Sequence, residues 1–161
     1  MDFEDFATLV PGVHAAKCEE TYNETSDVHL YIATVDGTPP TTALKNHVKA
    51  VIEDVMIMNQ NLHVFDAVYV DYAITVNVNI LAGVSNAEMK RKIEELLTAS
   101  YGPTSYGFGD TIYVSQIVST IFRSDNNILN VVVSSPAADI ETESTEIPRM
   151  NSYTVNVTGG I

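Results

Sequence analysis

Residues 68–80, VYVDYAITVNVNI, alternate apolar and polar side chains without interruption. A period of two indicates a β-strand with one buried face. Such a strand would be about 43 Å long at about 3.3 Å per residue, whereas strands in globular proteins rarely exceed about ten residues. We therefore expect the alternation to serve two adjacent sheets, with the division near Asp71 and Tyr72.

The residues before this stretch predict a first module, residues 1–70, which opens with a short amphipathic helix. Pro11-Gly12 fits the centre of a type II turn, in which glycine accepts a positive φ. Two strands of a hairpin are then expected over 13–22 and 28–35, because both are rich in β-branched and aromatic residues. The polar stretch NETSD between them indicates a turn.

A helix and a third strand complete the first module. Apolar residues recur at helical spacing over 44–55, and Thr41 or Thr42 can serve as the N-cap. A strand then begins near Leu62 and leads into the long alternation. The first module is therefore β-β-α-β after its opening helix.

The second module, residues 71–161, is predicted to be β-α-α-β-β. Residues 85–88, Ser-Asn-Ala-Glu, have the form of a capping box at the start of a helix, and Ser115 can cap a shorter helix. Strands are expected over 128–133 and 153–157. The acidic stretch SPAADIETESTEIP between these strands is interpreted as a flexible, solvated linker.

These patterns together predict an α+β fold class, with two small mixed or antiparallel sheets that are each covered by helices. The chain has 161 residues and 45% hydrophobic residues, which is enough for one domain or two small ones. No internal sequence repeat is evident.

Charge and targeting signals limit the classes of partner. The chain carries 8 Lys and Arg against 21 Asp and Glu, a formal net charge of -13, so nucleic acid and anionic membranes are poor partners. The acidic opening MDFEDFATLV lacks the basic start of a signal peptide, and no apolar stretch approaches membrane-helix length. We expect synthesis in a reducing cytoplasm, with the single Cys18 as a buried, reduced thiol.

No pattern indicates a catalytic, cofactor-binding or metal-ligating residue. The four histidines have no ligand spacing, and surface or half-buried positions explain them: His14, His29, His47 and His63. Asp66 and Asp71 are five residues apart in extended chain, so they point to opposite faces and cannot form a local acid–base pair. The loop YGPTSYGFGD lacks the residues that follow a phosphate-binding loop. We therefore expect a protein that is not an enzyme.

Several stretches, in order, resemble the carboxy-terminal part of baseplate J-like proteins, which are wedge components of contractile phage tails. These stretches are DFEDFATLVPGVHAAKC, VHLYIATVDGTPP, LHVFDAVYVDYAITVNVNI, GFGDTIYVSQIVSTIF and TEIPRMNSYTVNVTG, and together they span nearly the whole chain. Two features depart from the family. RSDNNILNV replaces a Pro-Gly-Val turn, and the larger amino-terminal region is absent, so we expect a fragment or a short member.

The resemblance implies a mechanical role without catalytic residues or cofactors. Such a subunit would pair with itself and with other wedge and hub proteins in a ring whose changes accompany sheath contraction. It would lie in the virion tail baseplate after assembly in the host cytoplasm.

Two alternatives stay open. One is a soluble regulatory domain that binds a small ligand between its two modules, and the other is a hydrolase that uses the histidines. Neighbouring genes for sheath, tube and hub proteins would favour the baseplate role.

Overall fold

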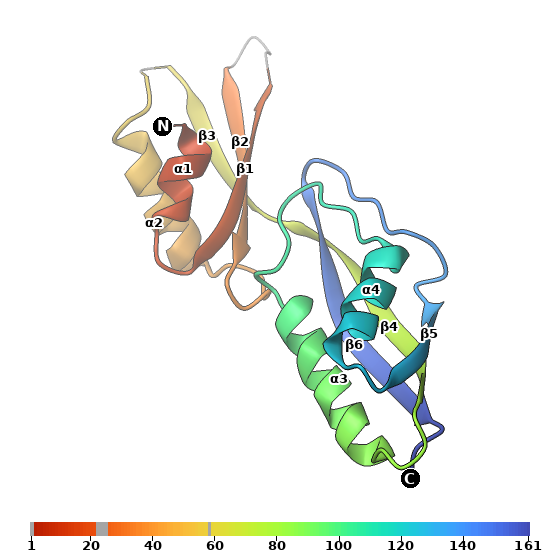
Figure 1. Cartoon of the computed structure of the whole chain (residues 1–161). Coiled ribbons are helices and arrows are strands. Elements are labelled where there is room, and N and C mark those ends of the chain that lie inside the picture. The colour runs from red at the N-terminus through yellow and green to blue at the C-terminus, as the bar shows by residue number, and fades with distance from the viewer. Residues whose placement is uncertain (1, 22–25, 58) are drawn as a thin grey trace. The chain divides into compact units, whose positions relative to one another are not determined.

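The computed structural model describes residues 2–21, 26–57 and 59–161. These residues form two compact units, each with a three-stranded sheet and two helices (Figure 1). The predicted α+β class and the predicted order of helices and strands are confirmed. No helix within the described ranges is long and apolar enough to cross a membrane.

The first unit consists of Met1–Tyr69 together with residues 107–109 and 143–147. Its elements are α1 (Phe3–Thr8), β1 (Val13–Thr21), β2 (Asp27–Thr34), α2 (Thr42–Glu53) and β3 (Asn61–Asp66). The strand order is β1-β2-β3, with β1 antiparallel and β3 parallel to β2. Both helices cover the same sheet face, and the core between them includes Ala7, Leu30, Ile32, Val48 and Ile52.

Local signals of the first unit behave as the sequence predicts. Gly12 has a φ of 99°, and the Val13 N–H donates to the Val10 carbonyl at 3.1 Å, which closes the predicted turn. Thr41 caps α2 because its hydroxyl accepts a hydrogen bond from the Leu44 N–H at 3.2 Å. The predicted hairpin is present, although most of its turn NETSD lies outside the described residues.

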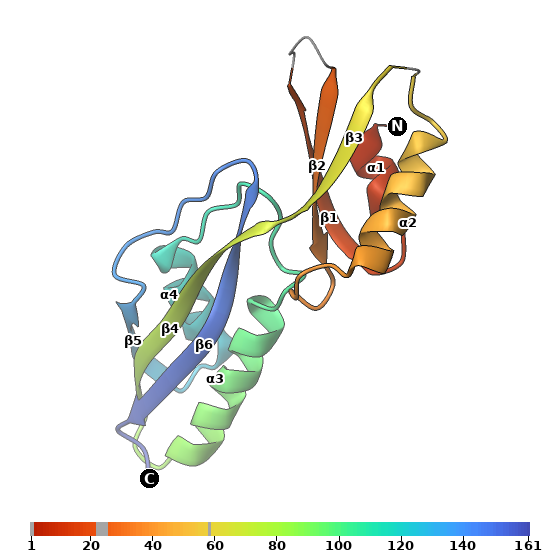
Figure 2. The ribbon, with the colours of Figure 1, turned by 180° about the vertical axis from the view of Figure 1, so that it is seen from behind.

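The second unit begins at Val70. It contains most of β4 (Val68–Ile80) and β6 (Glu146–Thr158), and all of α3 (Asn86–Ser100), α4 (Val114–Ser124) and β5 (Ile128–Ser135). The central strand β4 pairs antiparallel with β5 on one side and has β6 as its neighbour on the other. Helices α3 and α4 cover one face, whereas Figure 2 shows the uncovered face.

The alternation in β4 places its apolar side chains under the helices, as predicted. Ile74, Val76 and Val78 are at most 1% exposed and pack in one core with Met89, Ile93 and Leu97 of α3. Burying these side chains stabilises the unit by about 1.5–3 kcal/mol each relative to solvent exposure.

The long alternation is divided close to the expected place. A strand break lies at Ala67, and the change from the first to the second unit falls between Tyr69 and Val70, one residue before the predicted boundary of 70 and 71 and close to Asp71 and Tyr72. Ala67 is buried in a small cluster with Ala33 and Ile147. Val68 is 49% exposed, so the apolar face of β4 becomes core only from Tyr72 onward.

The first part of the acidic stretch after β5, residues 136–142, is tied to the second unit, which corrects the prediction of a flexible linker there. The backbones of Ile112 and Ile140 exchange hydrogen bonds of 2.8 and 2.9 Å, and Ile140 packs against the core. Asp139 Oδ1 accepts a hydrogen bond from the Val114 N–H at 2.9 Å, so Asp139 caps α4 in place of Ser115. Strand β6 then begins at Glu146, before the predicted range of 153–157.

Candidate interaction surfaces

Four rings gather on the face of the first sheet that α1 and α2 leave uncovered. His29 and Tyr31 come from β2, and His63 and Phe65 come from β3. The two histidine ring centroids are 5.7 Å apart in an edge-on arrangement, and Tyr31 stacks on Phe65 at 5.4 Å. Phe65 is 40% exposed, so this ring cluster can be reached by another molecule.

The parallel register of β2 and β3 creates this ring cluster, and sequence reasoning missed it. Residues 27–32 pair one to one with residues 61–66, which places histidine beside histidine and tyrosine beside phenylalanine. The two stretches, DVHLYI and NLHVFD, match in residue type at almost every position. Comparing short strands with one another would have indicated this pairing.

The surroundings of the histidines do not form a metal site. His63 Nε2 lies 3.6 Å from Asp27 Oδ1, and the Asn61 amide donates to the same oxygen at 3.3 Å. Within the described residues, no group of three or more His, Cys, Asp or Glu could hold a metal ion. His14 lies on β1 and His47 on α2, apart from the ring cluster.

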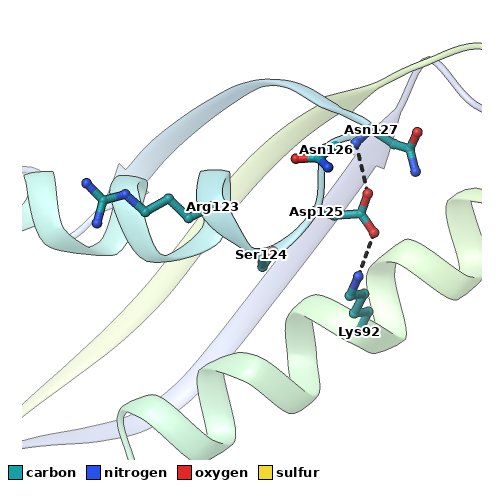
Figure 3. Close-up of a pocket in the computed structure, with 6 residues that line it drawn as sticks. All are labelled: Lys92, Arg123, Ser124, Asp125, Asn126 and Asn127. Carbon is teal, nitrogen blue, oxygen red and sulfur yellow. Dashed lines mark hydrogen bonds and ion pairs between the residues drawn. The ribbon is translucent and has the colours of Figure 1, made fainter.

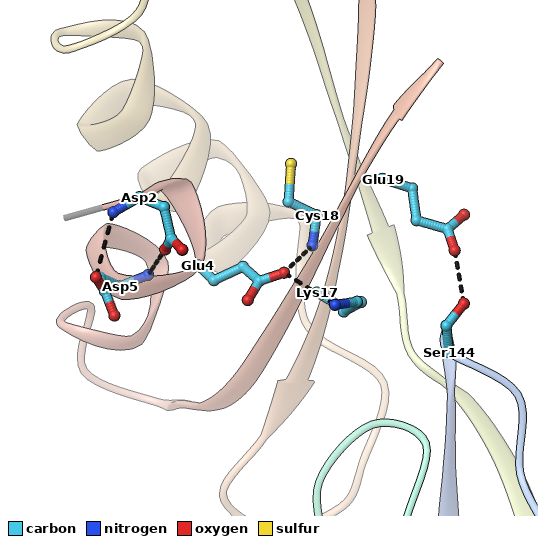
Figure 4. A network of polar contacts seen from close by, with 7 residues as sticks. All are labelled: Asp2, Glu4, Asp5, Lys17, Cys18, Glu19 and Ser144. Atoms are coloured by element: carbon cyan, nitrogen blue, oxygen red, sulfur yellow. Dashed lines mark hydrogen bonds and ion pairs between the residues drawn. The ribbon is translucent and has the colours of Figure 1, made fainter. Parts of the chain in front are cut away.

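The outer edge of the first sheet is partly blocked by α1 (Figure 4). Glu4 Oε1 accepts a hydrogen bond from the backbone N–H of Cys18 at 2.8 Å, and Lys17 Nζ lies 3.5 Å from the same oxygen. A backbone N–H that already donates to a side chain cannot pair with an incoming strand. The Glu4 carboxylate therefore protects this part of the β1 edge. Cys18 is half-buried rather than fully buried as predicted, and its side chain packs against the first core.

The uncovered face of the second sheet carries paired polar side chains. Arg149 Nε donates to Asp71 Oδ1 at 2.6 Å, and this hydrogen bond lowers the pKa of the Asp71 carboxyl below its ordinary value. Asn156 Nδ2 donates to Asn77 Oδ1 at 3.0 Å. Residue numbers rise in the same direction along both strands, so β4 and β6 run parallel. Asp66, by contrast, forms an ion pair with Lys45 in the first unit.

These two pairs also reveal a bulge in β6. In β4, Asn77 lies six positions after Asp71. In β6, Asn156 lies seven positions after Arg149. One extra residue therefore lies in β6 between the two pairs, which is the defining feature of a β-bulge.

A polar hollow of about 480 Å³ lies where α4 ends (Figure 3). Lys92 of α3 donates to Asp125 Oδ2 at 2.6 Å, and the Asn127 N–H donates to Asp125 Oδ1 at 2.8 Å. The hydrogen bond from Lys92, and to a smaller extent that from Asn127, holds the pKa of the Asp125 carboxyl below its ordinary value. The carboxylate thus joins the two helices and shapes the loop after α4.

Two tyrosines of the loop YGPTSYGFGD, residues 101–110, pack against the core of the second unit. Tyr101 and Tyr106 stack with centroids 6.0 Å apart and contact the second core. Burial raises the pKa of Tyr106 to about 12, and it also raises the pKa values of Tyr72 and Tyr101 above their ordinary value. All three phenols therefore stay protonated at neutral pH.

Two family models match consecutive parts of this chain. The Baseplate J-like central domain matches residues 1–70, and the Baseplate J-like protein C-terminal domain matches residues 72–157. The chain belongs to the Baseplate J-like family. The resemblance seen in the sequence is thereby confirmed.

A solved structure has a similar fold to this Baseplate J-like chain. It is a chain of the cryo-EM structure of the anti-feeding prophage (AFP) baseplate, 6-fold symmetrised, with a TM-score of 0.65 and 10% sequence identity. The match covers 92% of this chain and 36% of that chain, so the fold likeness concerns about a third of the solved chain. A comparison with curated proteins finds no match. Family and fold together support a structural role in a phage-type baseplate.

Proposed function

We propose that this chain, or a longer protein of which it is a part, is a wedge subunit of a contractile-tail baseplate. In this role it takes part in assembly of the baseplate ring and in triggering sheath contraction. One observation carries the proposal: the central and C-terminal Baseplate J-like domains follow one another over residues 1–70 and 72–157. Because the similar solved chain is much longer, the partners of the whole protein are part of the proposal.

The surfaces of the chain suit a subunit that contacts other proteins. The ring cluster on the first sheet exposes Phe65, and the outer strand β5 exposes Leu129 and Val132 by 54% and 51%. Aromatic side chains often anchor protein interfaces, because they bury much area at little entropic cost. We propose that such surfaces contact other wedge or hub proteins and further copies of this subunit in the particle.

We also propose that the chain acts without catalysis or a bound metal. The resemblance supports this, because it implies no catalytic residues for these domains. Elemental analysis of the purified chain should find no stoichiometric metal, and tightly held zinc or iron at one atom per chain would contradict the proposal.

Co-expression with tail proteins tests the wedge role. The chain should be purified together with the sheath, tube and hub proteins encoded beside it, and the complexes should be sized by light scattering. We expect a stable complex with at least one of these proteins. A strict monomer at high concentration that binds none of them would contradict the proposal.

A further inference from the structure

A groove runs between helix α3 and the edge strand β6. One part has a volume of 370 Å³ and is lined by Arg91, Glu94, Glu95, Thr98, Ala99 and Tyr153. A second part of 240 Å³ shares Thr98 and Tyr153 and continues to Pro103 and Met150. The α3 residues recur at spacings of three and four, so one face of the helix forms one wall.

The opposite wall is a strand with an unpaired edge. Among the residues that the structure describes, β4 is the only strand beside β6 in the sheet, and residues 151–154 are exposed. Among the described residues, no backbone hydrogen bond outside the sheet involves residues 150–154. Unpaired N–H and C=O groups along a strand edge are a template for an additional strand.

The bulge in β6 lies at the groove. It falls between Arg149 and Asn156, and this interval contains the residues that line the groove. A bulge bends a strand and redirects its side chains, and bulges are frequent at sheet edges beside binding sites. Here four consecutive side chains of β6 are exposed beside α3, in place of the usual alternation.

The charges of the groove favour a cationic occupant. Arg91 forms an ion pair with Glu95 at 2.6 Å, so these two charges offset each other. Glu94 takes part in none of the ion pairs of the described residues and adds a negative charge to a chain of net charge -13. A second copy of this acidic chain would be repelled, whereas lysine or arginine would be attracted.

We propose that this groove binds an extended segment of another protein, which adds a strand to β6 and places a lysine or arginine against Glu94. From Arg91 to Tyr101 the helix rises about 15 Å, which accommodates about four or five residues of extended chain. In a baseplate the segment belongs to a neighbouring subunit. That identification rests on the proposed function, whereas the chemistry of the groove does not.

Nuclear magnetic resonance with a synthetic peptide tests the groove directly. The probe is acetyl-Val-Thr-Lys-Thr-Val-amide, added to the isotope-labelled chain. We expect amide shifts to change in residues 91–103 and 150–154. A fully N-methylated version of the peptide should not bind, because strand addition requires its backbone N–H groups.

A charge reversal tests the role of Glu94. Glu94→Lys should weaken binding of the lysine peptide about fivefold, as expected for loss of a partly exposed ion pair. It should strengthen binding of the same peptide with glutamate in place of lysine. Glu141→Lys is the matched control, because Glu141 is exposed, does not line the groove and undergoes the same charge change.

Three results would overturn the inference: no shift changes at the groove at about millimolar peptide, equal binding of the N-methylated peptide, or equal weakening by Glu94→Lys and Glu141→Lys. If the peptide binds but the chain binds no tail protein, the proposed function fails while the groove stands. If tail proteins bind equally well to Glu94→Lys and the peptide does not bind, the groove fails alone.

Discussion

Val76 and Asn77 are neighbours in β4 but lie on opposite faces of the second sheet. Val76 is fully buried in the core, whereas Asn77 is exposed and accepts a hydrogen bond from Asn156. Val76→Asp should therefore be severely destabilising. An unpaired buried carboxylate costs several kcal/mol, in addition to about 1.5–3 kcal/mol of lost burial, against a typical total stability of about 5–15 kcal/mol.

Asn77→Asp is the matched substitution, because aspartate keeps an acceptor for Asn156 on the exposed face. Its effect should stay within about 0.5 kcal/mol. Thermal melting of both variants measures the difference, and equal losses would contradict the assignment of faces. A normal melt for Asn77→Asp with lost binding of a tail protein would place this polar face in an assembly interface.

The ion pair of Lys92 with Asp125 predicts a dependence on pH. This contact lowers the pKa of the Asp125 carboxyl, so its stabilisation is fully present above the ordinary aspartate pKa and is lost as pH falls through the lowered pKa. Because Lys92 is half exposed, Lys92→Met should cost at most about 1 kcal/mol at neutral pH. The cost should disappear in acid.

Denaturant unfolding at a series of pH values measures this cost. Lys90→Met is the control, because Lys90 is an exposed lysine of the same helix that forms no ion pair with the described residues. A loss that does not vary with pH, or an equal loss for Lys90→Met, would contradict the role of the Asp125 contact.

At the scale of elements, helix α4 depends on a residue outside its own sequence. Asp139 accepts the Val114 N–H, so Asp139→Ala should cost about 0.5–2 kcal/mol of stability, as for other N-terminal caps. Asp139→Asn should retain most of that stability, because asparagine is an equally good acceptor. Ser115→Ala, in the exposed first turn, should change little.

Chemical denaturation of these three variants distinguishes capping from other roles. If Ser115→Ala costs as much as Asp139→Ala, the helix is capped locally after all. If Asp139→Asn is as unstable as Asp139→Ala, the negative charge near the helix N-terminus matters more than the hydrogen bond.

The sequence predicted features that depend on residues close together in the chain and missed features that depend on residues far apart in it. The α2 cap at Thr41, the turn at Gly12 and the faces of β4 depend on near neighbours, and the sequence pattern was sufficient for each. The cap at Asp139 and the pairing of His29 with His63 join residues far apart in the chain. Local periodicity carries no information on such contacts.

The early start of β6 has the same cause. Residues 146–152 lack a clear alternation, and Pro148 is unfavourable within a central strand. Pairing with β4 makes this segment a strand, and its position at the sheet edge makes the proline tolerable. The groove between α3 and β6 was therefore not predictable from sequence, since both its bulge and its open edge arise from this pairing.

For the whole molecule, the pattern of helices and strands predicted two small α+β modules, but no residue by itself indicated a function. Family resemblance supplied the functional hypothesis, because the evidence is spread over many short stretches along the chain. Evidence that is spread along the whole chain in this way is expected for a structural subunit. In the proposed role, the protein would act through surfaces such as the ring cluster rather than through a few reactive side chains.

The protein composition of purified tail particles tests the baseplate role most directly. Particles isolated from the producing cells on a density gradient should be analysed by quantitative mass spectrometry. We expect peptides from both modules of this chain to accompany the sheath and tube proteins at a constant ratio in every particle fraction. Their absence from particles that contain the sheath and tube, while the chain is abundant in the cell lysate, would contradict the baseplate role.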